Sequence, residues 1–131
     1  MTTGLLHHVE LYVNDLAAAR AFWDWFLAEL GYAQFQCWDQ GVSWKLGETY
    51  LVFVQTAEAH RDVPHHRCRA GLNHLAFHAA SRAHVDEITA KLRERGVTIL
   101  YEDRHPFAGG PDYYAVFFEA PERFKVELVA P

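Results

Sequence analysis

The sequence has few of the features that mark membrane-spanning or disulfide-rich proteins. Its two cysteines, Cys37 and Cys68, show no metal-knuckle spacing and are too few for a disulfide framework, so we expect both to be reduced. No apolar run approaches the roughly 20 residues that cross a bilayer, and no membrane partner is expected. The N-terminus lacks the charged and apolar regions of a signal peptide, which predicts a cytoplasmic location.

Basic residues are also sparse. The chain has 12 lysines and arginines against 17 acidic residues, for a net charge of −5 with neutral histidines, and the basic residues form no cluster. This charge pattern offers no footprint for phosphate backbones, so we expect no nucleic-acid partner. Half of the 131 residues are hydrophobic, enough for the core of a single domain, 1–131, or of two small modules that share a core.

A short alternating segment occurs twice, 66 residues apart. Residues 6–13 (LHHVELYV) and 72–79 (LNHLAFHA) both alternate apolar and polar positions, which is typical of a half-buried strand. Each copy carries a histidine, His8 or His74, at the same phase on the face away from the core. The same face also carries Glu10 and Tyr12 in the first copy and Ala76 and His78 in the second.

The elements that follow each copy repeat as well. A helical pattern ends at Gly31 in the first half and at Gly96 in the second, and three short strand patterns follow each helix. These strands are predicted at 33–38, 42–46 and 49–55, and again at 97–101, 113–119 and 124–129. The sequence therefore predicts an α+β fold of two βαβββ modules, with module one at 5–56, a polar linker at 57–71 and module two at 72–130.

One carboxylate and two histidines stand out in this plan. Glu127 lies on a strand otherwise built for burial, where a carboxylate is costly unless it is paired, protonated or bound to a metal. Taken singly, His8 and His74 would be read as core-edge residues bonded to the backbone. Their matched phase, with Glu127 available, instead favours a site for one divalent metal ion (Zn, Ni, Mn or Fe(II)) with positions left for water and substrate.

These motifs resemble the vicinal oxygen chelate superfamily, which includes glyoxalase I, bleomycin-resistance proteins, fosfomycin-resistance enzymes, methylmalonyl-CoA epimerases and extradiol dioxygenases. The matching segments are His8-Val9-Glu10-Leu11 with Asn14-Asp15-Leu16, Leu30-Gly31-Tyr32, residues 71–77 and residues 124–128. The resemblance implies paired modules whose mixed sheets form a cup, with a metal ion at its floor held by His8, His74 and Glu127. It also implies a small-molecule substrate and a homodimer.

Two departures from that pattern concern the ligands. Glyoxalase I has a fourth ligand, a glutamate on the last strand of module one, and aligning 126–128 with 52–54 places Phe53 there. Gln55, on the same face, is only a weak substitute. Extradiol dioxygenases have a tyrosine shortly before the final glutamate, where this chain has Phe117; Tyr113 or Tyr114 could supply the missing hydroxyl.

The resulting prediction is a metal-dependent enzyme of the glyoxalase type, isomerase- or lyase-like, acting on a small oxygenated metabolite. Glu10 is a candidate general base or, equally, a solvated rim residue. The candidate pocket residues are Tyr12, Trp44, Phe53, Gln55, His78 and Tyr114, and for each aromatic one core packing is an equal alternative. The alternative functions are an extradiol-type dioxygenase and a non-catalytic protein that sequesters a drug or metabolite, as bleomycin-resistance proteins do.

Overall fold

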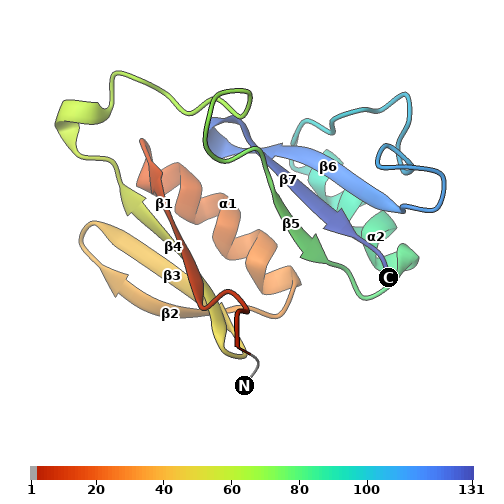
Figure 1. Ribbon diagram of the computed structural model, residues 1–131, viewed down its shortest axis with the longest axis horizontal. Helices are drawn as coiled ribbons and strands as arrows, with labels where there is room; N and C mark the ends of the chain where they lie inside the picture. Colours follow the sequence, from red (N-terminus) through yellow and green to blue (C-terminus); the bar gives the residue numbers. More distant parts are fainter. Residues whose placement is uncertain (1–2) are drawn as a thin grey trace. The chain divides into compact units, whose positions relative to one another are not determined.

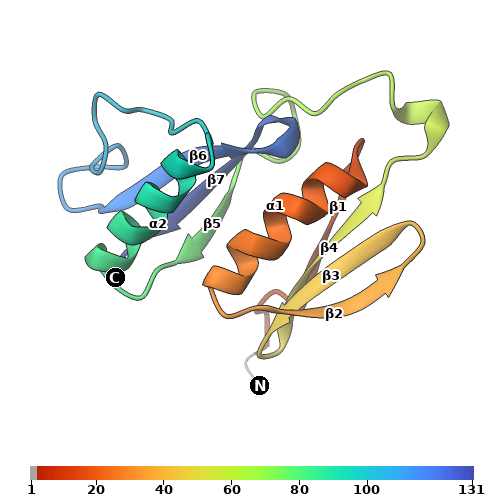
Figure 2. The same ribbon diagram turned by 180° about the vertical axis from the view of Figure 1, so that it is seen from behind.

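The computed structural model describes residues 3–131, and the chain divides after Pro64 into two compact units (Figures 1 and 2). We call residues 3–64 unit one and residues 65–131 unit two. Each unit is a mixed sheet with one helix packed on it, which confirms the predicted α+β class with two repeated modules. Among the described helices, none is long and apolar enough to span a membrane.

Unit one has the sheet order β1-β4-β3-β2, in which β1 runs parallel to β4 and the other neighbours are antiparallel. Its strands are β1 (His8–Val13), β2 (Ala33–Trp38), β3 (Gly41–Leu46) and β4 (Thr49–Gln55), and a short 3-10 turn, η1 (Glu58–His60), follows. Helix α1 (Leu16–Glu29) covers one face of the sheet (Figure 2). It begins where Asp15 Oδ1 accepts the Ala18 N–H at 3.1 Å, and it ends before Gly31, whose φ of +96° favours glycine.

The core of unit one lies between α1 and the sheet. Trp23, Phe26 and Leu27 of α1 are fully buried, and the Trp23 ring lies 4.9 Å from the ring of Phe53 on β4. Because side chains alternate along a strand, the residues of β1 that do not face α1 lie on the opposite, open face of the sheet. These are His8, Glu10 and Tyr12, and all three are exposed.

Unit two repeats this arrangement. Its strands β5 (Leu75–His78), β6 (Ala115–Ala120) and β7 (Phe124–Val129) have the order β5-β7-β6, with β5 parallel to β7. Helix α2 (Arg82–Glu94) begins where Ser81 Oγ accepts the His84 N–H at 3.1 Å, and it buries Val85, Ile88 and Leu92. A 3-10 turn, η2 (Pro121–Arg123), joins β6 to β7.

The strand predicted at 97–101 is wrong as a full strand, because only one bridge forms, between Ile99 and Phe118. Two backbone hydrogen bonds, Leu100 N–H to Phe117 O and Glu119 N–H to Thr98 O, hold the segment beside β6 at 2.8 and 3.0 Å. Tyr101 then takes a φ of +57°, which turns the chain away from the sheet. The bridge occupies the place that β2 has in unit one, next to the third strand of the order.

Candidate metal centre

The open face of unit two carries the buried carboxylate that the sequence singled out. Glu127 is only 3% exposed and lies on β7, between Ala76 of β5 and Phe117 of β6. The inner position of β7 explains this burial, because neighbouring strands cover both sides of the residue. A carboxylate in such a place needs partners that compensate for its lost hydration.

His74 is one of these partners. Its Nε2 lies 3.2 Å from Glu127 Oε1, and its Nδ1 lies 2.7 Å from Asn73 Oδ1. An amide oxygen can only accept, so Nδ1 of His74 carries a proton. In the neutral ring Nε2 then presents a lone pair towards a carboxylate oxygen, and the two atoms require a proton or a cation between them.

Tyr113 supplies the second partner. Its hydroxyl donates to Glu127 Oε2, and this bond, together with burial and the carboxylate charge, raises the pKa of Tyr113 to about 12. Gly109 makes room for the tyrosine ring, because a Cβ at that position would overlap it. One carboxylate oxygen is thus occupied by a hydroxyl, and the other faces His74.

This arrangement fits one side of a divalent metal site. A ligating histidine commonly donates its other ring N–H to an oxygen acceptor, which sets the tautomer and orients the ring, as Asn73 does for His74. Tyr113 orients the carboxylate in the same way. A cation could take the place of a proton between His74 Nε2 and Glu127 Oε1, and both donor types suit the metals expected from the sequence.

The third predicted ligand, His8, belongs to the open face of unit one. Its ring stacks on Tyr50 of β4 at 4.7 Å with an interplanar angle of 3°, and its Nδ1 lies 2.9 Å from Nδ1 of His7. When His8 donates this hydrogen bond, its Nε2 carries the lone pair that a metal would use. Within residues 3–131, no three His, Cys, Asp or Glu side chains gather into a group that could hold a metal ion.

Four of the expected pocket residues lie on the helix-covered faces of their sheets, not on the open faces that carry the histidines. Phe53 packs on Trp23, and Trp44 Nε1 donates to Asp24 of α1 at 2.9 Å. Tyr114 donates its hydroxyl to Asp86 of α2. Phe53 and Trp44 are buried in the core under α1, whereas Tyr114 is half-exposed.

Gln55 is the fourth of these residues, and its amide group holds the beginning of α1. Its Oε1 accepts the Leu16 N–H at 3.1 Å, and its Nε2 donates to Asn14 O at 2.7 Å. The amide oxygen is therefore already bonded on the helix side of the sheet, so Gln55 is no substitute ligand. By contrast, Tyr12 and His78 lie on the open faces of their sheets and are exposed.

The strand register also corrects the alignment of the two repeats. Glu127 pairs with Ala76, two residues after His74, and the equivalent pair in unit one is Val52 with Glu10, two residues after His8. The counterpart of Glu127 is therefore Val52 rather than Phe53. Valine cannot ligate a metal either, so the conclusion that this position supplies no fourth ligand is unchanged.

Sequence reasoning gave Tyr113 only a minor place, as a substitute for the hydroxyl absent at Phe117. The structure makes it the residue in contact with Glu127, whereas Tyr114 turns to the helix side. The signal was the alternation itself: β6 pairs Phe117 with Glu127, so the odd-numbered residues share the open face. The sequence did not reveal which face Tyr113 occupies, because the point where the loop 102–112 ends and the strand begins could not be located from the pattern.

The chain is similar in sequence to known proteins. The family model described as Glyoxalase/Bleomycin resistance protein/Dioxygenase superfamily matches residues 7–117, a range that includes His8 and His74 and ends before Glu127. The uncharacterized protein YqjT of Bacillus subtilis (strain 168) is 60% identical over 126 residues, which cover 96% of this chain and 98% of YqjT.

Solved structures show the same likeness. The crystal structure of a candidate glyoxalase from Bacillus halodurans has a TM-score of 0.97 at 64% identity, covering 98% of this chain and 97% of its own. The lactoylglutathione lyase of Agrobacterium tumefaciens (TM-score 0.68, 24% identity, 98% and 94% covered) shares the fold. The same holds for the fosfomycin resistance protein FosX of Listeria monocytogenes (TM-score 0.72, 23% identity, 100% and 95% covered).

Proposed function

Because the chain belongs to the glyoxalase/bleomycin resistance protein/dioxygenase superfamily, we propose that it is a metal-dependent enzyme of the glyoxalase type. The reaction would be isomerase- or lyase-like, on a small oxygenated metabolite. The observation that carries the proposal is the contact of His74 with the buried Glu127, whose facing atoms lie 3.2 Å apart and whose outer atoms are held by Asn73 and Tyr113.

In this proposal His74 and Glu127 bind one divalent ion together with His8, taken from the same chain or from a second copy in a homodimer. When bound, the ion supplies Lewis-acid chemistry, which stabilises negative charge on a substrate oxygen. Tyr113 keeps Glu127 oriented by donating to its second oxygen. Burial of the carboxylate keeps water from competing for it, which strengthens its interaction with a cation.

Proton transfer is assigned to Glu10. It lies on the same face of β1 as His8, two residues along the strand, and it is exposed. An exposed carboxylate retains its hydration and can exchange protons with solvent, whereas the buried Glu127 is held by two partners. Glu10 is therefore suited to take a proton from a substrate carbon and return it at another position.

Metal content tests the proposal directly. Purified protein reconstituted with Zn, Ni, Mn or Fe(II) should retain about one ion per chain after dialysis, measured by elemental mass spectrometry, and Glu127→Gln should lose it. Glu102→Gln is the matched control, because Glu102 is exposed and forms its ion pair with Arg93. Wild-type protein that stays metal-free after reconstitution would refute the proposal and favour the drug- or metabolite-sequestering alternative.

Glu10→Gln separates binding from chemistry. The variant should retain the metal and lose turnover of whichever α-oxygenated substrate the wild type converts, followed by proton exchange with deuterated water. A variant that keeps full turnover would show that Glu10 is a solvated rim residue.

An extradiol-type dioxygenase is the second candidate, and the contact between Tyr113 and Glu127 favours it. This hydroxyl replaces the one that Phe117 cannot provide beside the carboxylate. Oxygen consumption by Fe(II)-loaded protein with a catechol would identify this activity, and its absence under conditions where isomerase turnover is seen would exclude it.

A cytoplasmic location is also part of this proposal. Cys37 and Cys68 are both free and exposed. Thiols persist in this state in reducing compartments.

A further inference from the structure

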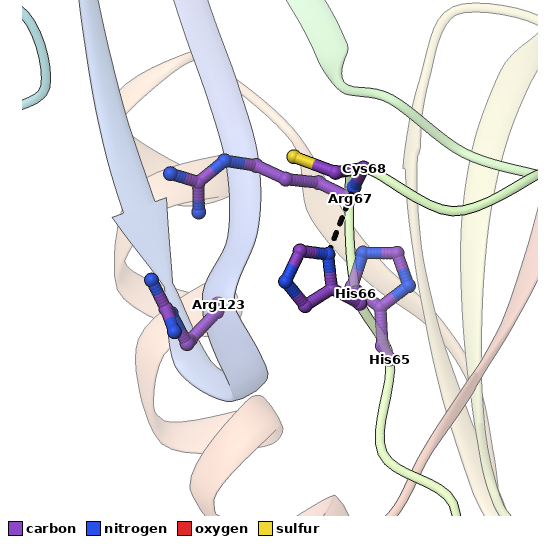
Figure 3. A pocket seen from close by; sticks show the side chains of 5 residues that line it. All are labelled: His65, His66, Arg67, Cys68 and Arg123. Carbon is purple, nitrogen blue, oxygen red and sulfur yellow. Dashed lines mark hydrogen bonds between the residues drawn. The ribbon is translucent and has the colours of Figure 1, made fainter.

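A second polar site lies in unit two, away from the contacts that define the His74–Glu127 pair. A cavity of about 120 Å³ is lined by His65, His66, Arg67, Cys68 and Arg123. Figure 3 shows the two guanidinium groups on one side of it and the imidazole rings on the other. At roughly 30 Å³ per water molecule, the space suits a group of a few heavy atoms.

Two arginines supply the positive charge that lines this cavity. Arg67 Nη1 and Arg123 Nε both donate to the same oxygen of Glu119, at 2.6 and 3.1 Å. Burial by itself raises the pKa of Glu119, but the hydrogen bonds from Arg67 and Arg123 outweigh it and hold that pKa below its usual value. One carboxylate therefore faces two guanidinium groups, and a second carboxylate, Glu122, lies near enough to His65 for its charge to act on that ring.

The arginines also retain donors. A guanidinium has five N–H groups, and each arginine uses one of them on Glu119. The Arg67 side chain is only 20% exposed, so water reaches little of it, while Arg123 is 70% exposed and lies at the mouth of the cavity. Arg123 belongs to the turn η2, where Glu122 and Arg123 both adopt positive φ, at 65° and 63°.

The histidines add polar atoms from the other side. Nδ1 of His66 accepts the Cys68 N–H at 3.1 Å, which leaves the His66 Nε2–H as a donor in the neutral ring. The ring of His65 stacks on Phe124 at 4.1 Å, and its buried Nε2 has no hydrogen-bond partner among the residues that the structure describes. Burial and the nearby His66 lower the pKa of His65, against an opposing contribution from the charge of Glu122.

We propose that this cavity binds a small tetrahedral oxyanion, either inorganic phosphate or the phosphate group of a small ester. Donors from Arg67 and Arg123 lie on one side of the cavity and the His66 ring on the other (Figure 3), which suits a tetrahedral acceptor better than a planar carboxylate. The two guanidinium charges oppose a metal cation, although histidines and a cysteine are present. Glu119 competes with the anion for both arginines and so limits its affinity.

Nuclear magnetic resonance of the full chain tests this, with inorganic phosphate and glycerol phosphate as probes at constant ionic strength. Phosphate should shift the Nε–H signals of Arg67 and Arg123 and the backbone signal of Cys68 in a saturable manner. Arg123→Gln should weaken binding at least about tenfold, because it removes hydrogen bonds to a charged group. Arg104→Gln, which removes an arginine that packs on Tyr101 outside the cavity, should leave the affinity unchanged.

Glu119→Gln gives an effect of opposite sign. It frees both arginines and removes the competing charge, so phosphate should bind more tightly than in the wild type. Arg67→Gln should weaken binding as well; if that buried substitution prevents folding, the exposed Arg123 still decides the question. Glu127→Gln should bind phosphate normally, which separates this site from the proposed metal centre.

The affinities for the two probes distinguish a phosphate ester from the free ion. Tighter binding of glycerol phosphate than of inorganic phosphate would show that the natural ligand is an ester, and equal binding would assign the site to the free ion. Absence of saturable shifts, equal weakening in Arg104→Gln and Arg123→Gln, or acetate binding as tightly as phosphate would overturn the proposal.

Discussion

Removal of the Tyr113 hydroxyl is the sharpest test of the proposed metal centre. In Tyr113→Phe the ring can stay beside Gly109, while Glu127 Oε2 loses its donor. Loss of a group that orients a ligating carboxylate typically lowers metal affinity by about 10- to 100-fold. Tyr114→Phe is the matched control, because Tyr114 is the next residue and also donates to a carboxylate, Asp86, on the helix side of the sheet.

The two variants should differ in metal affinity but not in stability. A hydrogen bond to a charged group contributes about 1.5–3 kcal/mol, and partial exposure of both tyrosines reduces this to about 1 kcal/mol for each. Urea unfolding of the metal-free proteins should therefore show similar small losses. Competition with a chromogenic chelator should show weaker metal binding for Tyr113→Phe alone.

The pH dependence provides an independent check on the same contact. The pKa of Tyr113 is raised to about 12 from the ordinary value of 10.0, so the folded chain holds this proton more tightly than the unfolded chain. The stabilisation is complete below pH 10 and is lost as the pH rises towards 12. Tyr113→Phe should lose part of this decline, and equal metal affinity in Tyr113→Phe and wild type would refute the assigned role.

Three further predictions concern the core, the assembly and the loop. Phe53→Ala should lower the free energy of unfolding by about 3–5 kcal/mol in urea titrations, because Phe53 is fully buried under α1; a pocket residue would cost far less. If each site takes its ligands from two chains, mixing the His8→Ala and His74→Ala variants should recover about one metal ion per mixed dimer, because one of its two sites keeps both histidines. No recovery would mean that each site forms within one chain. Gly109→Ala should weaken metal binding as Tyr113→Phe does, because the added Cβ displaces the Tyr113 ring, and unchanged binding would contradict this positioning.

Much of the fold follows from patterns that the sequence states openly. Alternation over residues 6–13 and the stop at Gly31 predict β1 and the end of α1, and the second half repeats these signals. The strand at 97–101 could not be excluded in this way, because the turn at Tyr101 comes from a φ of +57° that no residue type announces. Local pattern indicates a strand but does not show how long its pairing continues.

The candidate site was partly predictable for a similar reason. Phase alone placed His74 and Glu127 on one face, and the structure brings them within 3.2 Å. Phase also excludes Phe53 from the open face of its own sheet, but only once the register between strands is known, and register depends on pairing across the sheet rather than on order along the chain. The cavity around Arg67 lies at the junction of a linker and a turn, where no periodicity exists to read.

The strand register places the acidic residues Glu10 and Glu127 differently in the two halves. In each half, the pair of facing residues two positions after the histidine contains one acidic side chain, but on different strands. Glu10 lies on the edge strand of its sheet, whereas Glu127 lies on an inner strand. A carboxylate on an edge strand stays hydrated and mobile, whereas a carboxylate on an inner strand is dehydrated and fixed in place. The substitutions Glu10→Ala and Val52→Glu would give the first half the residue pair of the second. A carboxylate suited to proton transfer and one suited to metal binding therefore differ here only by a shift to the neighbouring strand.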